Sequence, residues 1–191
     1  MPAERAYVPA MTAPAAPMTA EELLRANIPN KRTELVRGVL VVREPAGARH
    51  GGVATSLALR LGAHVERSGA GRLFAAETGF TLTRGPDTVR APDVAFVSRE
   101  RLPEPLPQGY FDLAPDLAVE VLSPGDRPGE VLAKVADWVS AGTRLVWIVD
   151  PERRLARCYR ADGTESLMSA DGTLDGEDVL PGFSCPLESI L

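Results

Sequence analysis

Long apolar runs, paired cysteines and a secretion signal are all missing from this sequence, and each absence excludes a class of protein. No apolar run approaches the roughly 20 residues that a membrane-spanning helix needs. The N-terminus lacks the basic region and apolar stretch that direct secretion. The two cysteines, Cys158 and Cys185, lack the paired spacing of zinc ligands, so we expect reduced structural thiols. Together these absences predict a cytoplasmic protein without a membrane partner.

Several signatures of nucleotide-dependent and hydrolytic enzymes are also missing. The sequence has neither a GxxxxGK[ST] phosphate loop nor a GxGxxG fingerprint, and Ser123 does not lie in a GxSxG elbow. His50 and His64 have no cysteine partners and no HxxxH spacing, so we expect no zinc site. His50 precedes a predicted helix, where it could cap the helix or contact a phosphate. The net charge of −5 argues against a protein that coats DNA non-specifically, but it leaves nucleic-acid binding open.

The chain has the length of one domain, which we place at residues 18–191. Residues 1–17 are rich in Ala and Pro and show little periodicity, so we expect a flexible arm. Capping and apolar patterns predict three helices, over residues 19–27, 50–68 and 126–141. Asp126 is positioned to cap the third of them.

Short apolar or alternating segments predict the strands of the domain. They are residues 34–44 (two strands around a hairpin break), 72–83, 88–97, 116–122, 145–149, 154–168 and 173–180. The segments 72–83 and 88–97 flank a turn and predict a hairpin. Both faces of 116–122 are largely apolar, which is typical of a central strand. This order predicts an α/β fold with a mixed β-sheet flanked by helices and added β-hairpins.

Two acids interrupt apolar, strand-like segments of this fold. Asp93 lies in APDVAFV (91–97) and Glu120 lies in APDLAVEVLSP (114–124). A buried carboxylate without a partner costs several kcal/mol, so each acid predicts a cation or strong hydrogen bonds beside it. Lys134 follows on the next predicted helix and could orient or deprotonate a water, or stabilise a phosphate. The set predicts a divalent-metal site that hydrolyses phosphodiesters, with Glu34 as a fourth member.

Each of these residues also has a simpler interpretation. Asp93 follows Pro92 and could be a turn residue that satisfies local backbone donors. Lys134 lies four residues after Glu130, so an exposed helical ion pair would explain it. Glu34 could be an exposed strand acid. Glu120 is the hardest to explain in this way, because acids rarely occupy the middle of an apolar strand.

These motifs resemble the Uma-two family, a bacterial family of restriction-endonuclease-like proteins within the PD-(D/E)XK nuclease superfamily. The resemblance spans about residues 18–191 and is most specific in one stretch. The matching segments are MTAEELL, ELVRGVLVV, the helix beginning at His50, APDVAFV, PDLAVEVLSPGD, the helix with Lys134 and Trp138, AGTRLVWIVDPERR and LPGFSCPLESIL. The run PDLAVEVLSP, followed by the lysine helix and VWIVDP, is the most specific of these.

The resemblance implies a restriction-endonuclease-like core with Mg²⁺ (Mn²⁺ as a substitute) held by Asp93, Glu120 and the backbone carbonyl of Val121. In the superfamily motif E-x-K the lysine would stand at position 122, which is leucine here. The resemblance implies that Lys134, on the next helix, takes its place, with Glu34 matching the acid before the hairpin.

We therefore expect a divalent-metal-dependent endonuclease whose substrate is DNA. Many nucleases of this type act as two copies, which by analogy predicts a homodimer. Two alternatives stay open: a catalytically silent binding or assembly protein that keeps the nuclease fold, and a nuclease that acts on RNA or on branched or single-stranded nucleic acid.

Overall fold

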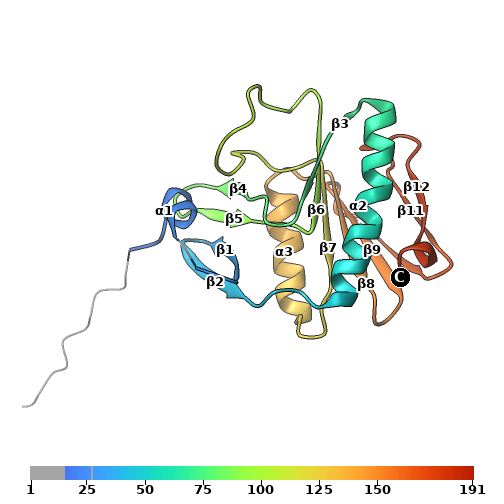
Figure 1. The fold of residues 1–191 in the computed structure, drawn as a ribbon, viewed down its shortest axis with the longest axis horizontal. Coiled ribbons are helices and arrows are strands. Elements are labelled where there is room, and N and C mark those ends of the chain that lie inside the picture. Colours follow the sequence, from blue (N-terminus) through green and yellow to red (C-terminus); the bar gives the residue numbers. More distant parts are fainter. Residues whose placement is uncertain (1–15, 27) are drawn as a thin grey trace, which may run out of the picture.

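A computed structural model describes residues 16–26 and 28–191, whose strands are divided mainly between two sheets (Figure 1). Most of the predicted flexible arm, residues 1–17, lies outside the described residues. The helices are α1 (Ala20–Arg25), α2 (Ala48–Ser68), α3 (Pro128–Ser140) and the 3₁₀ helix η1 (Leu187–Ser189). Within the described part of the chain, none of the helices has the length and apolar character needed to cross a membrane.

The larger sheet has six strands in the order β10-β9-β8-β7-β6-β3. Its strands are β3 (Gly71–Ala75), β6 (Val94–Ser98), β7 (Leu117–Val121), β8 (Leu145–Asp150), β9 (Leu155–Arg160) and β10 (Glu165–Ser169). Strands β7 and β8 pair in parallel through the α3 crossover, and the other neighbours pair antiparallel, so the sheet is mixed as predicted. Every residue of β7 and β8 is buried, which confirms that the segment at 116–122 forms a central strand.

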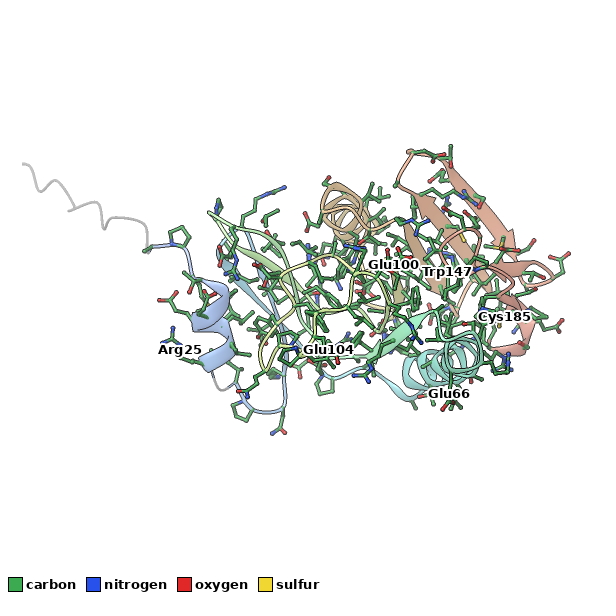
Figure 2. The ribbon with its side chains drawn as sticks, turned by 90° about the horizontal axis from the view of Figure 1, so that it is seen from above. Arg25, Glu66, Glu100, Glu104, Trp147 and Cys185 are labelled. Carbon is green, nitrogen blue, oxygen red and sulfur yellow. The ribbon has the colours of Figure 1, made fainter. Side chains whose placement is uncertain are left out.

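Helices α2 and α3 cover opposite faces of this sheet. One face of β7, with Leu117, Val119 and Val121, packs in the cluster that includes α2 and the C-terminal residues. The other face, with Ala118, packs against α3 through Trp138. Figure 2 places Glu66 on the outer side of α2 and Trp147 of β8 in the interior. Because side chains alternate along a strand, Glu120 belongs to the α3 face.

The smaller sheet has four antiparallel strands in the order β2-β1-β5-β4. Its strands are β1 (Arg32–Val36), β2 (Val39–Arg43), β4 (Phe80–Thr83) and β5 (Thr88–Arg90). Helix α1 packs on this sheet through Leu23, which shares a small cluster with Leu35 and Val89. Strands β11 (Thr173–Asp175) and β12 (Ser184–Pro186) form a separate hairpin. The small sheet and α1 lie at one end of the molecule, and α2 and this hairpin lie at the other (Figure 1).

The hairpin predicted from 72–83 and 88–97 is split between the two sheets. Strands β4 and β5 pair in the small sheet, whereas β3 and β6 pair in the large one. The chain leaves β3 through Glu77, whose φ of 69° lies in the left-handed region and interrupts the strand. Pro92 breaks the second segment, because it has no backbone N–H for a ladder. The prediction of two continuous strands was therefore wrong.

Two helix starts and one strand also differ from the sequence prediction. Arg127, not Asp126, is the N-cap residue of α3, and the Asp126 side chain accepts a hydrogen bond from the Ser123 N–H at 2.8 Å instead. Helix α2 begins at Ala48, so His50 lies inside its first turn and is not a cap. Strand β12 was not predicted: Phe183, Cys185 and Leu187 alternate with exposed residues there, but the strand itself has only three residues.

Candidate active site

Asp93 connects the start of β6 to β7. Its backbone N–H donates to the Val119 carbonyl at 3.0 Å, and its Oδ2 accepts the Val121 N–H at 2.8 Å. The carboxylate therefore continues the strand ladder at the point where Pro92 cannot. The N–H and C=O of one strand residue point to the same side, so the carbonyl of Val121 also faces Asp93.

Two basic side chains contact the same carboxylate. His50 Nε2, from the first turn of α2, lies 3.1 Å from Asp93 Oδ2, and Arg32 Nη2, from β1, lies 2.9 Å from Oδ1. The side chain of Asp93 is only 2 % exposed. Burial alone would raise the pKa of Asp93, but the hydrogen bonds from His50 and Val121 and the charge of Arg32 outweigh it and lower the pKa. Asp93 is therefore an ionised, fully partnered carboxylate and more than a local turn residue.

Glu120 points from the middle of β7 toward α3. Its Oε2 accepts a hydrogen bond from Lys134 Nζ at 3.0 Å, and its Oε1 accepts one from Trp138 Nε1 at 3.1 Å. Lys134 and Trp138 are four residues apart and so lie on one face of the helix. Burial raises the pKa of Glu120, and the nearby carboxylates of Asp93 and Glu34 raise it further against the opposing charge of Lys134.

Lys134 links Glu120 to the small sheet. Its Nζ lies 3.2 Å from Glu34 Oε1, and the lysine side chain is 15 % exposed. Burial would lower the pKa of Lys134, but Glu120 and Glu34 outweigh it and raise the pKa, so the amine is protonated. The interpretation of Lys134 as the exposed partner of Glu130 is wrong, because Glu130 pairs with Arg43 instead.

Glu34 is buried and paired, so its interpretation as an exposed strand acid is wrong as well. Arg90 Nη1 of β5 lies 2.9 Å from Glu34 Oε2, and the Ala91 N–H donates to Oε1 at 3.3 Å. Burial opposes ionisation, but Lys134, Arg90 and this backbone donor lower the pKa of Glu34. Arg90 is held in turn by Asp137 of α3, with Nη2 2.6 Å from Oδ2.

A cavity of about 400 Å³ brings the predicted site residues together. Asp93, Glu120, Val121, Lys134 and Glu34 all line it. Glu120 and Val121 come from β7, Asp93 directly precedes β6, Lys134 comes from α3 and Glu34 from β1. The cavity therefore lies where the two sheets meet.

The donor set of this cavity fits the hard divalent cation that the fold implies. Mg²⁺ takes oxygen ligands, and Asp93, Glu120 and the Val121 carbonyl offer only oxygen. Burial is the main cause of the raised pKa of Glu120, the carboxylates of Asp93 and Glu34 add to it, and a cation beside the three acids would oppose all of these effects. Within residues 16–26 and 28–191, no group of three or more His, Cys, Asp or Glu side chains is arranged to hold a metal ion, so this set depends on two carboxylates and a carbonyl.

Three residues of the site were missed from the sequence. Arg32, Arg90 and Asp137 complete the ion pairs around the acids, but each is separated by more than 40 positions from the carboxylate or guanidinium that it contacts. The available signal is an arginine near each acid: Arg90 directly precedes APD, and Arg32 lies two residues before Glu34. Nothing in their spacing shows which acid each arginine faces.

The fold and the position of these acids define a protein of the restriction-endonuclease-like class. The chain belongs to the Uma2 family, whose model carries the description "Putative restriction endonuclease" and matches residues 20–188. A crystal structure described as a "putative nuclease belonging to DUF820" from Anabaena variabilis ATCC 29413 has the same fold. It superposes with a TM-score of 0.79 at 20 % sequence identity, over 91 % of this chain and 97 % of that one. No curated protein matches the chain.

Proposed function

We propose that this protein is a divalent-metal-dependent endonuclease that hydrolyses phosphodiester bonds of DNA. The observation that carries the proposal is the convergence of Asp93, Glu120 and Lys134 on one cavity, although they lie on separate elements. Membership of the Uma2 family supports the nuclease class, and the choice of DNA rests on that family alone.

Asp93, Glu120 and the carbonyl of Val121 would hold the cation, with Mn²⁺ as a substitute for Mg²⁺. When bound, such a cation neutralises phosphate charge and lowers the pKa of a coordinated water. The backbone N–H of Val121 and the side chains of His50 and Trp138 fix the two carboxylates through the hydrogen bonds described above, so both acids keep their orientation.

Lys134 supplies positive charge to the reacting phosphate and does not act as the base. Its raised pKa keeps the amine protonated near neutral pH, so it has no lone pair to accept a proton from water. Glu34 positions the amine through its 3.2 Å contact and is fixed by Arg90 on the opposite side. A lysine on α3 can therefore serve the role that the superfamily motif gives to a lysine on the strand.

The test is cleavage of plasmid DNA with Mg²⁺ or Mn²⁺ by the wild type, Asp93→Asn, Glu120→Gln and Lys134→Met. We expect each variant to lose at least about a hundredfold in rate. Glu66→Gln, which changes an exposed acid on the outer side of α2, is the control and should cleave like the wild type.

Two results would change the proposal. Cleavage of RNA or of branched DNA alone would correct the substrate. A folded wild type that cuts no nucleic acid with either cation would favour the silent binding protein. Light scattering on the free and DNA-bound protein tests the proposed homodimer, since one copy offers one site for two strands.

A further inference from the structure

Arg32 covers the carboxylate of Asp93 from the side of the small sheet. Its Nη2 lies 2.9 Å from Asp93 Oδ1, and its Nε lies 3.4 Å from Glu77 Oε1. Arg32, His50 and Asp93 line the 400 Å³ cavity and also a second cavity of about 530 Å³, which runs along α2 beside Gly51 and Ala54. Arg32 therefore lies where the two cavities adjoin and contacts Asp93, a candidate cation ligand.

The four carboxylate oxygens of Asp93 and Glu120 differ in how firmly their partners are held. Oδ2 of Asp93 is bonded to a backbone N–H, and Oε1 of Glu120 is bonded to Trp138, which is fully buried. Oε2 of Glu120 is bonded to Lys134, which is itself fixed by Glu34. The partners in these three contacts are therefore held by strand β7 and helix α3.

The fourth oxygen, Oδ1 of Asp93, has a more loosely held partner. Arg32 is 23 % exposed, and Glu77, the other acid that it contacts, is 59 % exposed. The Arg32–Glu77 pair is exposed on the Glu77 side and holds Arg32 only weakly, because water screens such a pair and its side chains lose entropy on pairing. Of the four contacts, Arg32–Oδ1 is the one that an arriving anion can exchange at the lowest cost.

A phosphodiester is the anion that suits this exchange. A guanidinium binds phosphate oxygens and carboxylate oxygens through the same pair of N–H donors. We propose that Arg32 is a phosphate-binding residue that leaves Asp93 for the substrate backbone and so frees Oδ1 to bind the cation. This inference rests on the proposed function, because it takes Asp93 as a cation ligand.

The exchange couples two binding events. While Arg32 contacts Oδ1, a cation must compete with the guanidinium for the same oxygen. Once a phosphate holds Arg32, that competition ends, so nucleic acid and cation each strengthen the binding of the other by the same factor. A purely structural Arg32, which only neutralises Asp93, predicts no such coupling.

Calorimetric titration with Mn²⁺ alone tests the competition without cleavage. We expect Arg32→Gln to bind Mn²⁺ about tenfold or more tightly than the wild type, since one charge-assisted hydrogen bond no longer opposes the ion. Arg43→Gln is the matched control, because it removes the same charge from a nearby arginine that pairs with Glu130 and Asp126 and not with Asp93. It should change the affinity about twofold at most. Equal or weaker Mn²⁺ binding by Arg32→Gln overturns the inference.

Binding of a short DNA duplex without added divalent cation tests the other half of the exchange. Arg32→Gln should weaken this binding and reduce the dependence of log K on log salt by about one. An unchanged salt dependence overturns the phosphate role. Thermal melting of both variants, and of Arg32→Ala as a second substitution, confirms that the proteins compared are folded.

Asp93→Asn separates this inference from the proposed function. Wild-type Mn²⁺ binding that is lost in Asp93→Asn, with no gain in Arg32→Gln, overturns the inference and leaves the metal site in place. If Arg32→Gln binds Mn²⁺ more tightly and the double variant Arg32→Gln/Asp93→Asn still does so, the ion binds elsewhere. That result overturns the inference and the proposed ligand set together.

Discussion

The two sheets of this protein bury different kinds of side chain. The large sheet encloses mainly apolar residues: all eleven residues of β7 and β8 are buried, and nine of them are apolar, with Glu120 and Asp150 as the exceptions. The small sheet is covered on fewer sides: Val39 of its edge strand β2 is 65 % exposed, yet the sheet buries Glu34, Thr88 and Arg90. The first sheet holds a large hydrophobic core, and the second supplies charged side chains to the cavity between them.

This difference explains how the site tolerates so many buried charges. Glu34 and Arg90 come from the small sheet, Glu120 from the large sheet, and Lys134 and Asp137 from α3. Each charge has an opposite partner within 3.2 Å. Because an unpaired buried charge is costly, this network is stable only while the small sheet, the large sheet and α3 stay together.

The largest expected effect is on the large sheet. Trp147→Ala should lower the free energy of unfolding by about 3–5 kcal/mol, because it removes a fully buried indole ring that stacks on Phe183 and leaves a cavity. Urea denaturation measures the change. Trp147→Phe is the control and should cost less, since it keeps a ring and removes an indole N–H that has no hydrogen-bond partner among the described residues. Equal losses would contradict the packing argument.

Removal of a charge from the small sheet should have the next largest effect. Arg90→Met keeps the length of the side chain but leaves Asp137 and one oxygen of Glu34 without their partner. We expect a loss of about 3 kcal/mol in urea denaturation, at the low end for a broken buried pair, because Lys134 still faces Glu34. A loss near zero would show that the ion network does not hold the two sheets together.

The same network predicts how stability depends on pH. The pKa of Glu34 is lowered below 4.5 in the folded protein by Lys134 and Arg90, against the effect of burial. Its ionised form therefore stabilises the fold above pH 4.5, and this stabilisation is lost as the pH falls through the lowered pKa. In Glu34→Gln, the free energy of unfolding should fall less steeply below pH 4.5 than in the wild type. Parallel curves from denaturation at pH 3 to 7 would contradict the pairing.

The smallest expected effect is on the exposed edge of the small sheet. Val42 of β2 is 45 % exposed, and Val42→Thr should change the free energy of unfolding by about 0.5 kcal/mol or less. The matched change in the large sheet, Val119→Thr, places a hydroxyl in a fully buried site and should cost about 1–3 kcal/mol. Similar changes in the free energy of unfolding for the two variants would contradict the difference in burial between the sheets.

Local patterns in the sequence were sufficient for most of the elements. The Thr19 capping box begins α1, the four-residue apolar repeat marks α2, and Gly69 ends α2 with a φ of 64°. Features that depend on partners were not predictable: the split of residues 72–97 over two sheets reflects which strand each half meets. Of the hairpin formed by β11 and β12, only β11 was predicted, within the longer segment 173–180.

The sequence by itself determined that Asp93 and Glu120 are acids in or beside apolar strands and that a lysine follows on a helix, because burial and periodicity are encoded in neighbouring residues. Only the tertiary structure decided which cation each acid meets. Arg32 meets Asp93, and Lys134 meets both Glu120 and Glu34. These pairs join different elements, with β1 facing Asp93 beside β6 and α3 facing both β7 and β1. Electrostatic contact depends on distance in space, which sequence separation does not give.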